Sequence, residues 1–293
     1  MTRILTSVAI GALLAGTVAA APRQRATFSS RTLGVRLDVL VTDHGKPVAG
    51  LQADDFEVRD NGVLQQVTLA TAFDVPVNAV LVLDTSDSTS GPKLTNLVAA
   101  SRAFVDRLHP VDRAALVTFS HTVKPRVALT GDFRLIREAL DAITPNGETS
   151  ALDAIYVGLL TAEADSGRSL LIVCTDGRDT ASWLTEDEVL DSAKRGNAVI
   201  YALAAERARG WPVLRDVADA TGGHTVDVTS SRDLSGEFRK ILDDFRSRYI
   251  LTFVPAGVSQ AGFHRLDVKV RRGGLTVKAR PGYIGKGSSG NLP

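Results

Sequence analysis

The feature that most constrains this chain is a regular alternation of short apolar runs and longer amphipathic segments between residues 77 and 247. Residues 79–83 and 170–174 are continuous apolar runs, a pattern typical of strands buried on both faces of a parallel sheet. Segments such as 133–143 place their apolar residues on one helical face. This alternation predicts an α/β fold with a doubly wound, mostly parallel, Rossmann-like sheet, whose ligands bind at the carboxyl ends of the strands.

Boundary residues predict where several helices of this region begin. Thr149 precedes an apolar helix expected over 150–164, and this position predicts that Thr149 is its N-cap. Thr185 begins the capping-box pattern Thr-x-x-Glu, which predicts a helix start at that residue. Pro212 is expected to open a helix that Gly222-Gly223 ends.

Residues 32–73 and 248–284, which flank the α/β region, have the pattern of short strands. In the run 35–42 apolar residues occupy alternate positions, which is the period of a half-buried strand. Asp60-Asn61-Gly62 lies between two further strand-like runs and predicts a hairpin, because Asn and Gly tolerate a positive φ. The shared composition of the two ends leads to the hypothesis that they pair into one small β domain, with the α/β region inserted in it.

Residues 1–20 have the three parts of a secretory signal. Met1-Thr2-Arg3 is a short positive start, residues 4–18 form an uncharged and mostly apolar run, and small residues stand at 17–21. The apolar run is shorter than the roughly 20 residues that a membrane span needs. The mature protein is therefore predicted to be exported, periplasmic or extracellular, without a membrane span; an uncleaved N-terminal anchor is the alternative. The Gly/Ser-rich residues 285–293 are predicted to be a disordered tail.

The charge balance and the single cysteine exclude some classes of function. The chain has 34 basic and 33 acidic residues and a formal net charge of +1, so no basic field is expected to bind nucleic acid. Cys174 cannot form an internal disulfide, and its apolar neighbours predict a buried structural thiol. Four histidines share no metal-ligand spacing and are interpreted as surface or loop residues, which does not favour Zn²⁺: His109, His121, His224 and His264.

An acid and two hydroxyls follow the first buried strand. Asp84, Ser86 and Ser88 occupy alternate positions, and alternate side chains of an extended segment point the same way. They are therefore expected to converge at the carboxyl edge of the sheet, although these three residues alone fit a polar turn equally well. Carboxylate and hydroxyl oxygens are hard ligands that suit Mg²⁺ or Mn²⁺, whereas the small number of charges argues against a dedicated Ca²⁺ site.

Two further residues are expected at the same edge. Thr149 stands where a loop enters a helix, and its hydroxyl would face a cation bound there. Asp176 follows the second buried strand in the sequence Thr-Asp-Gly. Since the carboxyl ends of parallel strands share one edge, the sequence predicts a divalent-cation site. Its residues are Asp84, Ser86, Ser88, Thr149 and Asp176.

These residues resemble the metal-ion-dependent adhesion site of the von Willebrand factor type A domain. That motif reads Asp-x-Ser-x-Ser, then a distant Thr, then a distant Asp in a strand-end Thr-Asp-Gly, and all three parts occur here in order. The resemblance implies that Ser86 and Ser88 bind the metal directly and that Thr149 joins them in the ligand-ready state. Asp84 and Asp176 would act directly or through waters, which leaves one position open for a carboxylate of a protein partner.

The flanking strands resemble bacterial secreted proteins with a von Willebrand factor A-related domain. The segments that carry this resemblance are 45–48, 54–58, 60–62, 248–251 and Arg280-Pro281-Gly282-Tyr283. One departure lies at Asp87, where the adhesion-site motif usually has Gly. An additional carboxylate beside the metal loop would strengthen cation binding or crowd the partner.

The implied function is a secreted, divalent-cation-dependent adhesion or recognition module and not an enzyme, so no catalytic residue is assigned. One alternative is a structural envelope protein with a vestigial metal site. Another is a metal-dependent hydrolase with Asp84 as nucleophile. Against the hydrolase stand the expected lack of a companion Lys or Arg beside the motif, of a paired general acid, and of a Gly-rich phosphate loop.

Overall fold

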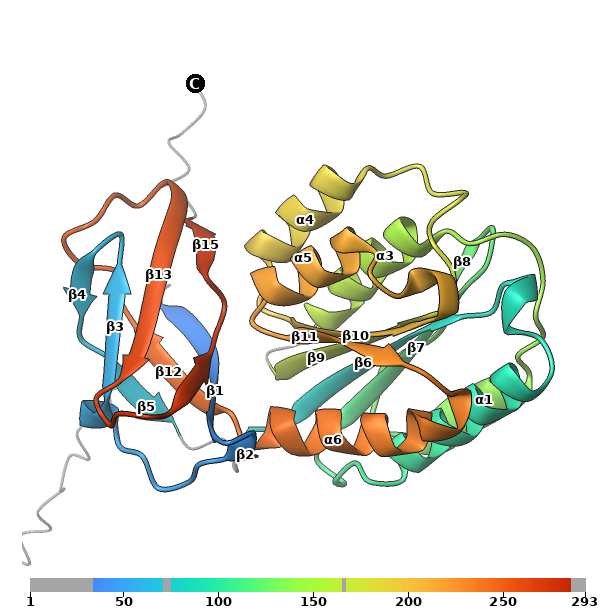
Figure 1. The fold of residues 1–293 in the computed structure, drawn as a ribbon, viewed down its shortest axis with the longest axis horizontal. Helices are drawn as coiled ribbons and strands as arrows, with labels where there is room; N and C mark the ends of the chain where they lie inside the picture. Colours follow the sequence, from blue (N-terminus) through green and yellow to red (C-terminus); the bar gives the residue numbers. More distant parts are fainter. Residues whose placement is uncertain (1–33, 71–74, 165–166, 286–293) are drawn as a thin grey trace, which may run out of the picture. The chain divides into compact units, whose positions relative to one another are not determined.

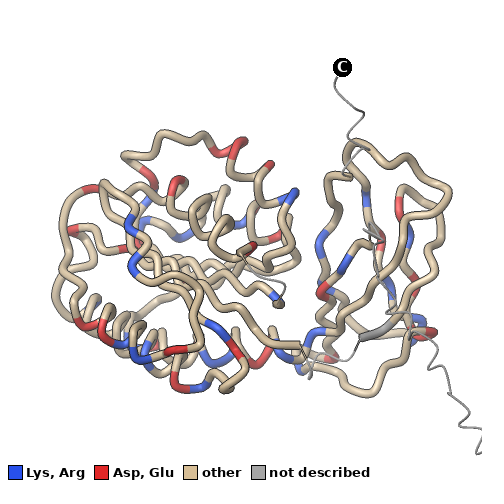
Figure 2. The backbone as a smooth tube through the Cα atoms, turned by 180° about the vertical axis from the view of Figure 1, so that it is seen from behind, with Lys and Arg blue, Asp and Glu red and all other residues tan. Residues whose placement is uncertain are grey.

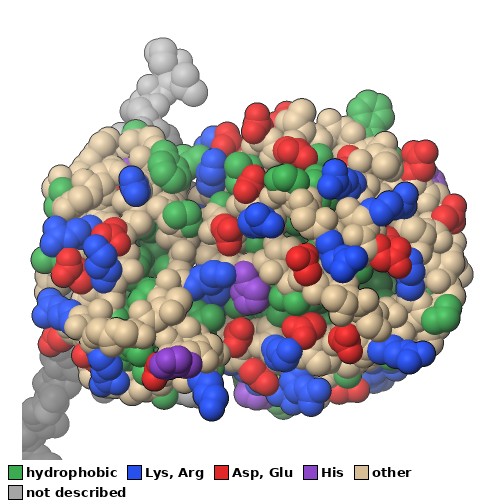
Figure 3. All heavy atoms as spheres, in the orientation of Figure 1, with side chains coloured by type: hydrophobic (Ala, Val, Ile, Leu, Met, Phe, Trp, Pro, Cys, Tyr) green, Lys and Arg blue, Asp and Glu red, His purple; other side chains and the backbone are tan. Residues whose placement is uncertain are grey.

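The computed structural model describes residues 34–70, 75–164 and 167–285 (Figure 1). The expected secretory signal at 1–20 and the expected tail beyond residue 285 lie outside the described residues. A helix that is long and apolar enough to cross a membrane is absent from the described part of the chain. Positive and negative residues are intermixed along the described backbone (Figure 2) and over the face shown in Figure 3.

Six strands form the central sheet in the spatial order β11-β10-β9-β6-β7-β8. Neighbouring strands are parallel except for β7 and β8, which are antiparallel. The strands are β6 (Val77–Asp84), β7 (Arg113–Phe119), β8 (Val123–Thr130), β9 (Arg168–Thr175), β10 (Val199–Ala205) and β11 (His224–Val228). The predicted doubly wound, mostly parallel sheet is confirmed, and the direction of winding reverses between β6 and β9.

Helices cover both faces of this sheet (Figure 1). The helices of one face are α1 (Pro92–Val105), α2 (Phe133–Asp141) and α6 (Leu234–Arg246). The helices of the other face are α3 (Ala151–Ala162), α4 (Glu186–Arg195) and α5 (Pro212–Ala220). Two predicted starts are confirmed: Thr185 and Glu188 form a capping box before α4, and Pro212 is the first residue of α5.

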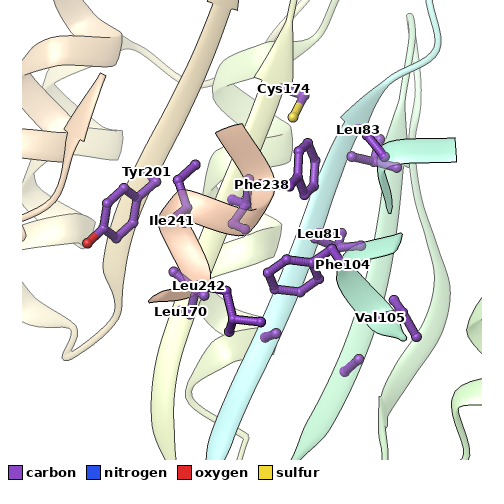
Figure 4. Close-up of a cluster of buried hydrophobic side chains, with 14 of the residues drawn as sticks. Leu81, Leu83, Phe104, Val105, Leu170, Cys174, Tyr201, Phe238, Ile241 and Leu242 are labelled. Carbon is purple, nitrogen blue, oxygen red and sulfur yellow. The ribbon is translucent and has the colours of Figure 1, made fainter. Parts of the chain in front are cut away.

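A tightly packed aromatic pair lies in the core beneath α1 and α6 (Figure 4). Phe104 of α1 meets Phe238 of α6 edge to face, with ring centroids 5.8 Å apart. Leu81 of β6 belongs to the same buried cluster. Cys174 is buried there too, and burial raises the pKa of its thiol well above the ordinary value, as expected of a structural cysteine.

Strands from the two ends of the chain pair with each other in two small sheets, which we call the terminal β region. β1 (Val35–Asp43) lies antiparallel to β12 (Tyr249–Phe253), and β3 (Phe56–Asp60) lies antiparallel to β13 (Gly262–Val270). The remaining strands are β2 (Lys46–Pro47), β4 (Val63–Gln65), β5 (Thr68–Ala70), β14 (Thr276–Lys278) and β15 (Gly282–Gly285). The two sheets share a core that includes Leu37, Val58 and Leu251.

A buried polar cluster adjoins the predicted hairpin turn of this region. The turn is confirmed, with Asn61 at φ 47° and Gly62 at φ 86° between β3 and β4. The interpretation of His264 as a surface or loop residue is wrong, because it lies in β13 and is 1% exposed. Its Nδ1 lies 2.8 Å from Asp60 Oδ1, and the Tyr283 hydroxyl donates to Asp60 Oδ2 at 2.7 Å. These partners are distant in sequence, so local patterning does not reveal the cluster.

Three buried arginines connect the terminal β region to the α/β region. Arg168, at the start of β9, places Nε 2.8 Å from Asp38 Oδ1 of β1. Arg248, two residues after the end of α6, donates to the Asp38 carbonyl oxygen at 3.0 Å. Arg280 donates to the Gly196 carbonyl oxygen at the end of α4, at 2.9 Å. Asp38 stands at a polar position of the alternating pattern, but these contacts bury it to 8% exposure.

Arg168→Met is expected to lower the free energy of unfolding by up to about 3–5 kcal/mol, because the buried Asp38 carboxylate then keeps only the more distant Arg36, whose Nε lies 3.7 Å from Asp38 Oδ2. Urea unfolding followed by circular dichroism would measure the loss. The double variant Arg168→Met/Asp38→Leu is expected to recover much of it, since two apolar residues need no charge partner. A double variant no more stable than Arg168→Met would contradict this explanation.

His224 is expected to make the stability depend on pH. Burial, together with the positive charges of Lys278 and Arg248, lowers the pKa of His224 to about 4. The unfolded chain, with a histidine pKa of roughly 6.5, therefore takes up this proton first as the pH falls. The contribution of neutral His224 is complete above about pH 6.5 and is lost as the pH falls from there towards 4.

The measurement is the free energy of unfolding at pH 7 and at pH 4.5, for the wild type and for His224→Gln. Because Gln does not titrate, the variant is expected to lose about 1–2 kcal/mol less than the wild type over this interval, a figure reduced for the partial exposure of the ring. Equal losses in the two proteins would show that His224 does not carry the dependence.

Candidate metal centre

Asp84 is the last residue of β6 and stands at the carboxyl edge of the sheet, beside β9. Its side chain is fully buried. One carboxylate oxygen accepts a hydrogen bond from the amide of Ser86 (2.9 Å), and the other accepts from the hydroxyl of Thr175 (2.6 Å). Burial raises the pKa of Asp84 above its ordinary value in spite of these donors, so a cation close by would stabilise the ionised carboxylate.

Ser86 and Ser88 come together, but not for the predicted reason. Ser88 lies in a short 3-10 turn, Asp87–Thr89, and not in an extended segment. The turn brings the two hydroxyl oxygens within 3.1 Å of each other, and Ser88 Oγ donates to Asp176 Oδ1 at 2.5 Å. Hydrogen bonds therefore connect Asp84, Ser86, Ser88 and Asp176 in one group.

Thr149 lies beside this group, although the prediction that it caps α3 is wrong. The N-cap is Ser150, one residue later. Thr149 belongs to the preceding loop and is tied to the loop after β9, because the amide of Thr180 donates to the Thr149 carbonyl oxygen at 2.9 Å. A side chain at Gly177 would place its first carbon 3.4 Å from Thr149 Oγ1. The Thr149 hydroxyl is thus next to the residue that follows Asp176.

The predicted residues border two hollows in the surface. Ser86, Ser88 and Thr149 line a groove of about 720 Å³. Asp84 and Asp176 line a second cavity of about 240 Å³. The structure therefore joins four of the residues by hydrogen bonds and sets Thr149 in the same groove as the two serines.

A lysine lies beside the motif, contrary to the expectation of none. Lys93, in the first turn of α1, places Nζ 2.9 Å from Asp176 Oδ2 and 3.0 Å from the Ser88 carbonyl oxygen. The same Nζ lies 2.9 Å from Glu206 Oε1, and Glu206 has a φ of 44°, which is uncommon for a residue with a side chain. The position of Lys93 could be predicted from the sequence, because the helix that begins directly after the motif has its first turn beside the motif.

Asp87, which stands where the motif usually has Gly, causes no backbone strain. Among the described residues, the positive φ values of non-glycine residues fall at His44, Asn61 and Glu206. Asp87 therefore has a conformation that any L-residue adopts, and its amide donates to the Gly147 carbonyl oxygen at 3.0 Å. Its exposed carboxylate lines the groove.

The donor set fits a hard divalent cation, because every candidate ligand supplies an oxygen. Within the described ranges, no three His, Cys, Asp or Glu side chains gather closely enough to hold a metal alone. Binding would therefore depend on the serine and threonine hydroxyls as well as on Asp84 and Asp176. With two carboxylates beside it and Lys93 on one of them, a cation here would keep a net attraction for an incoming anion.

Sequence comparison identifies the α/β region. A family model described as the von Willebrand factor type A domain matches residues 78–240, more than half of the chain. Inter-alpha-trypsin inhibitor heavy chain H2 from Mesocricetus auratus is 23% identical over 186 residues, which cover 57% of this chain and 19% of that protein. The heavy chain H2 from Mus musculus is 22% identical over 182 residues, with coverages of 57% and 19%. The match therefore spans about a fifth of the length of these relatives.

Solved structures share the fold. A von Willebrand factor type A protein from Catenulispora acidiphila is similar with a TM-score of 0.54 at 17% identity, covering 88% of this chain and 75% of that chain. Proximal thread matrix protein 1 from the mussel byssus, with a zinc-occupied metal-ion-dependent adhesion site, gives a TM-score of 0.53 at 16% identity. That match covers 63% of this chain and 49% of the mussel chain.

Lys93→Met is expected to raise the affinity for Mg²⁺ by about 3–10-fold, because it removes a positive charge that competes for Asp176. Calorimetric titration of Mg²⁺ would measure the change. Lys93→Arg, which keeps the charge, is the matched control and is expected to bind Mg²⁺ much as the wild type does. A lower affinity in Lys93→Met would mean that the lysine organises the site instead of competing with the cation.

Proposed function

The chain belongs to the von Willebrand factor type A domain family, and from this premise we propose that it is an exported recognition module whose bound cation takes a carboxylate from a protein partner. Domains of this family bind a divalent cation at the metal-ion-dependent adhesion site and mediate protein–protein interactions. The proposed cation is Mg²⁺, with Mn²⁺ as the alternative and Ca²⁺ less favoured. The proposed ligands are Asp84, Ser86, Ser88, Thr149 and Asp176.

The observation that carries this proposal is the hydrogen-bonded group formed by Asp84, Ser86, Ser88 and Asp176. Two carboxylates and two hydroxyls lie at the edge of the sheet where ligands of doubly wound folds bind. Hydroxyl ligands add no negative charge, so a cation held there remains attractive to an anion. A partner that offers an Asp or Glu side chain supplies this anion. The proposed function is binding, with no bond cleaved.

Lys93 favours a second candidate, a structural protein whose metal site is no longer used. Its ammonium group lies against the carboxylate of Asp176, which is a proposed metal ligand, and against the Ser88 carbonyl oxygen. In this reading the lysine charge replaces the metal charge permanently. The two candidates differ in one measurable property, which is the binding of Mg²⁺ by the isolated protein.

A hydrolase that uses Asp84 as nucleophile is less well supported. Asp84 is fully buried, and each of its oxygens already accepts a hydrogen bond, from Ser86 and from Thr175. A nucleophile needs an approach path and a free lone pair directed at the substrate. Asp84 is better suited to orient the loop and to balance a cation.

We place the module outside the cytoplasm, in the periplasm or the medium, on the basis of the signal pattern at residues 1–20. The zinc in the adhesion site of the mussel protein is a property of that protein. Because the same oxygen ligands also accept Zn²⁺, a metal titration series for this chain should include it beside Mg²⁺ and Mn²⁺.

Asp84→Asn is expected to weaken Mg²⁺ binding by at least about 10–100-fold while leaving the fold intact, because Asn keeps the shape and removes the charge. Without metal, the stability of the variant is expected to stay within about 1–2 kcal/mol of the wild type, because removal of the buried charge is offset by the loss of one of the two hydrogen bonds that Asp84 accepts. Calorimetry and thermal unfolding would measure the two effects. Asp216→Asn is the matched control, because Asp216 is exposed on α5 and lines neither the groove nor the cavity at the site.

Three outcomes of the titration are decisive. Mg²⁺ binding that is lost in Asp84→Asn and kept in Asp216→Asn supports the proposed site. Equal binding by all three proteins places the cation elsewhere. No binding by the wild type, even at millimolar Mg²⁺, favours the structural candidate in which Lys93 replaces the metal.

A further inference from the structure

The groove beside the proposed metal ligands carries opposite charges on its two sides. Its charged lining residues are Asp87, Glu148, Arg178 and Arg207. Asp87 and Glu148 belong to the loops after β6 and before α3, whereas Arg178 and Arg207 follow β9 and β10. β9 and β10 lie on the same side of β6 in the sheet, so the two arginines form the border of the groove on that side.

The two arginines stand next to the metal ligand Asp176 and have no acidic partner. The amide of Arg207 donates to the Asp176 carbonyl oxygen at 3.1 Å, and Arg178 Nε donates to the Arg207 carbonyl oxygen at 3.3 Å. Both side chains are exposed. In the described part of the chain no carboxylate forms an ion pair with either guanidinium group.

The loop that carries Arg178 is fixed to the helix that follows Thr149. The Thr180 amide donates to the Thr149 carbonyl oxygen at 2.9 Å. Asp179 Oδ1 accepts from the amide of Leu152 at 3.2 Å, at the first turn of α3. These bonds hold the backbone at Arg178 in place, so less conformational entropy is lost when its side chain binds a ligand.

Beside a metal that binds one anionic group of a ligand, two guanidinium groups without an ion-pair partner favour a further anionic group of that ligand over a neutral one. Arg presents a planar fork of donors that matches the two oxygens of a carboxylate, and such charge-assisted bonds are stronger than neutral ones. In the proposed function the cation takes one carboxylate from the partner, so the arginines are free for another. On the opposite side, Asp87 and Glu148 would repel an acid, and this repulsion fixes the direction of the bound segment.

We propose that the partner presents two neighbouring acidic side chains, one for the cation and one for Arg178 and Arg207. The proposal rests on the proposed metal site, because the first carboxylate binds there. In an extended segment, side chains two residues apart point the same way and are separated by about 6–7 Å. An extended Asp/Glu-x-Asp/Glu sequence is the shortest that meets this requirement, with neutral or basic residues on the side that faces Asp87 and Glu148.

The test uses two synthetic peptides of identical composition and net charge, titrated into the Mg²⁺-saturated protein by calorimetry. One peptide has two Asp residues separated by a single Gly, and the other has them separated by eight residues of Gly and Ser. The wild type is expected to bind the first peptide about five- to tenfold more tightly. Trp183, which is 94% exposed on the same loop, provides fluorescence as a second readout.

The variant Arg178→Gln/Arg207→Gln is expected to bind both peptides equally and to bind Mg²⁺ as the wild type does. Arg209→Gln is the matched control, because Arg209 is exposed and close in sequence but does not line the groove. It is expected to keep the preference for the closely spaced peptide. A preference that survives the double substitution overturns the assignment to these two arginines.

The outcomes separate this inference from the proposed function. Equal, Mg²⁺-dependent binding of the two peptides by the wild type overturns the second acidic position and leaves metal-dependent recognition standing. A preference that persists when Mg²⁺ is removed with EDTA shows that the arginines act without the metal, which overturns the two-point arrangement. If the protein binds Mg²⁺ but neither peptide, both the inference and the proposed recognition of carboxylates fail.

Discussion

The site depends on one feature of the sheet, the parallel pairing of β6 with β9 at the point where the winding reverses. This pairing places Asp84 and Asp176, which are far apart in the sequence, at the same edge. The hydroxyl of Thr175 crosses between the strands to Asp84, so the two strand ends orient each other. Every residue of both strands is buried, so a slip by one residue would move each side chain into the core on the other face of the sheet, where the packing does not fit it.

Charge, more than shape, decides what this edge of the sheet can bind. Burial raises the pKa of Asp84, because ionising a buried carboxylate costs free energy. A neighbouring cation would offset this cost. The ammonium group of Lys93 already neutralises part of the charge of Asp176, so less negative charge remains beside a bound metal. A cation at this site is therefore weakly neutralised by the protein and strongly attracted to an anion from outside. Arg178 and Arg207 extend the same preference along one side of the groove.

Buried arginines connect the terminal β region to the α/β region. Arg248 links the end of α6 to β1, and Arg168 links the start of β9 to the same strand through Asp38. β1 therefore has two buried faces, one against the core that contains Leu37 and one against the α/β region. Periodicity predicted the apolar face of this strand correctly. It could not predict that Asp38, on the polar face, is also buried, because the covering surface comes from residues more than a hundred positions away.

The sequence by itself determined the α/β class, the hairpin at Asn61-Gly62 and the helix start at Thr185, because these follow from local periodicity and local backbone preferences. The sequence also predicted the adhesion-site motif, because the carboxyl ends of parallel strands lie at one edge of the sheet. Only the tertiary structure decided that Ser88 sits in a 3-10 turn, that Thr149 is not a helix cap, and that Lys93 lies on Asp176. The physical reason is that the contacts of these residues, Asp87 with Gly147, Thr149 with Thr180 and Lys93 with Asp176, join segments that are distant in the sequence, and their geometry is set by packing and not by the order of the residues.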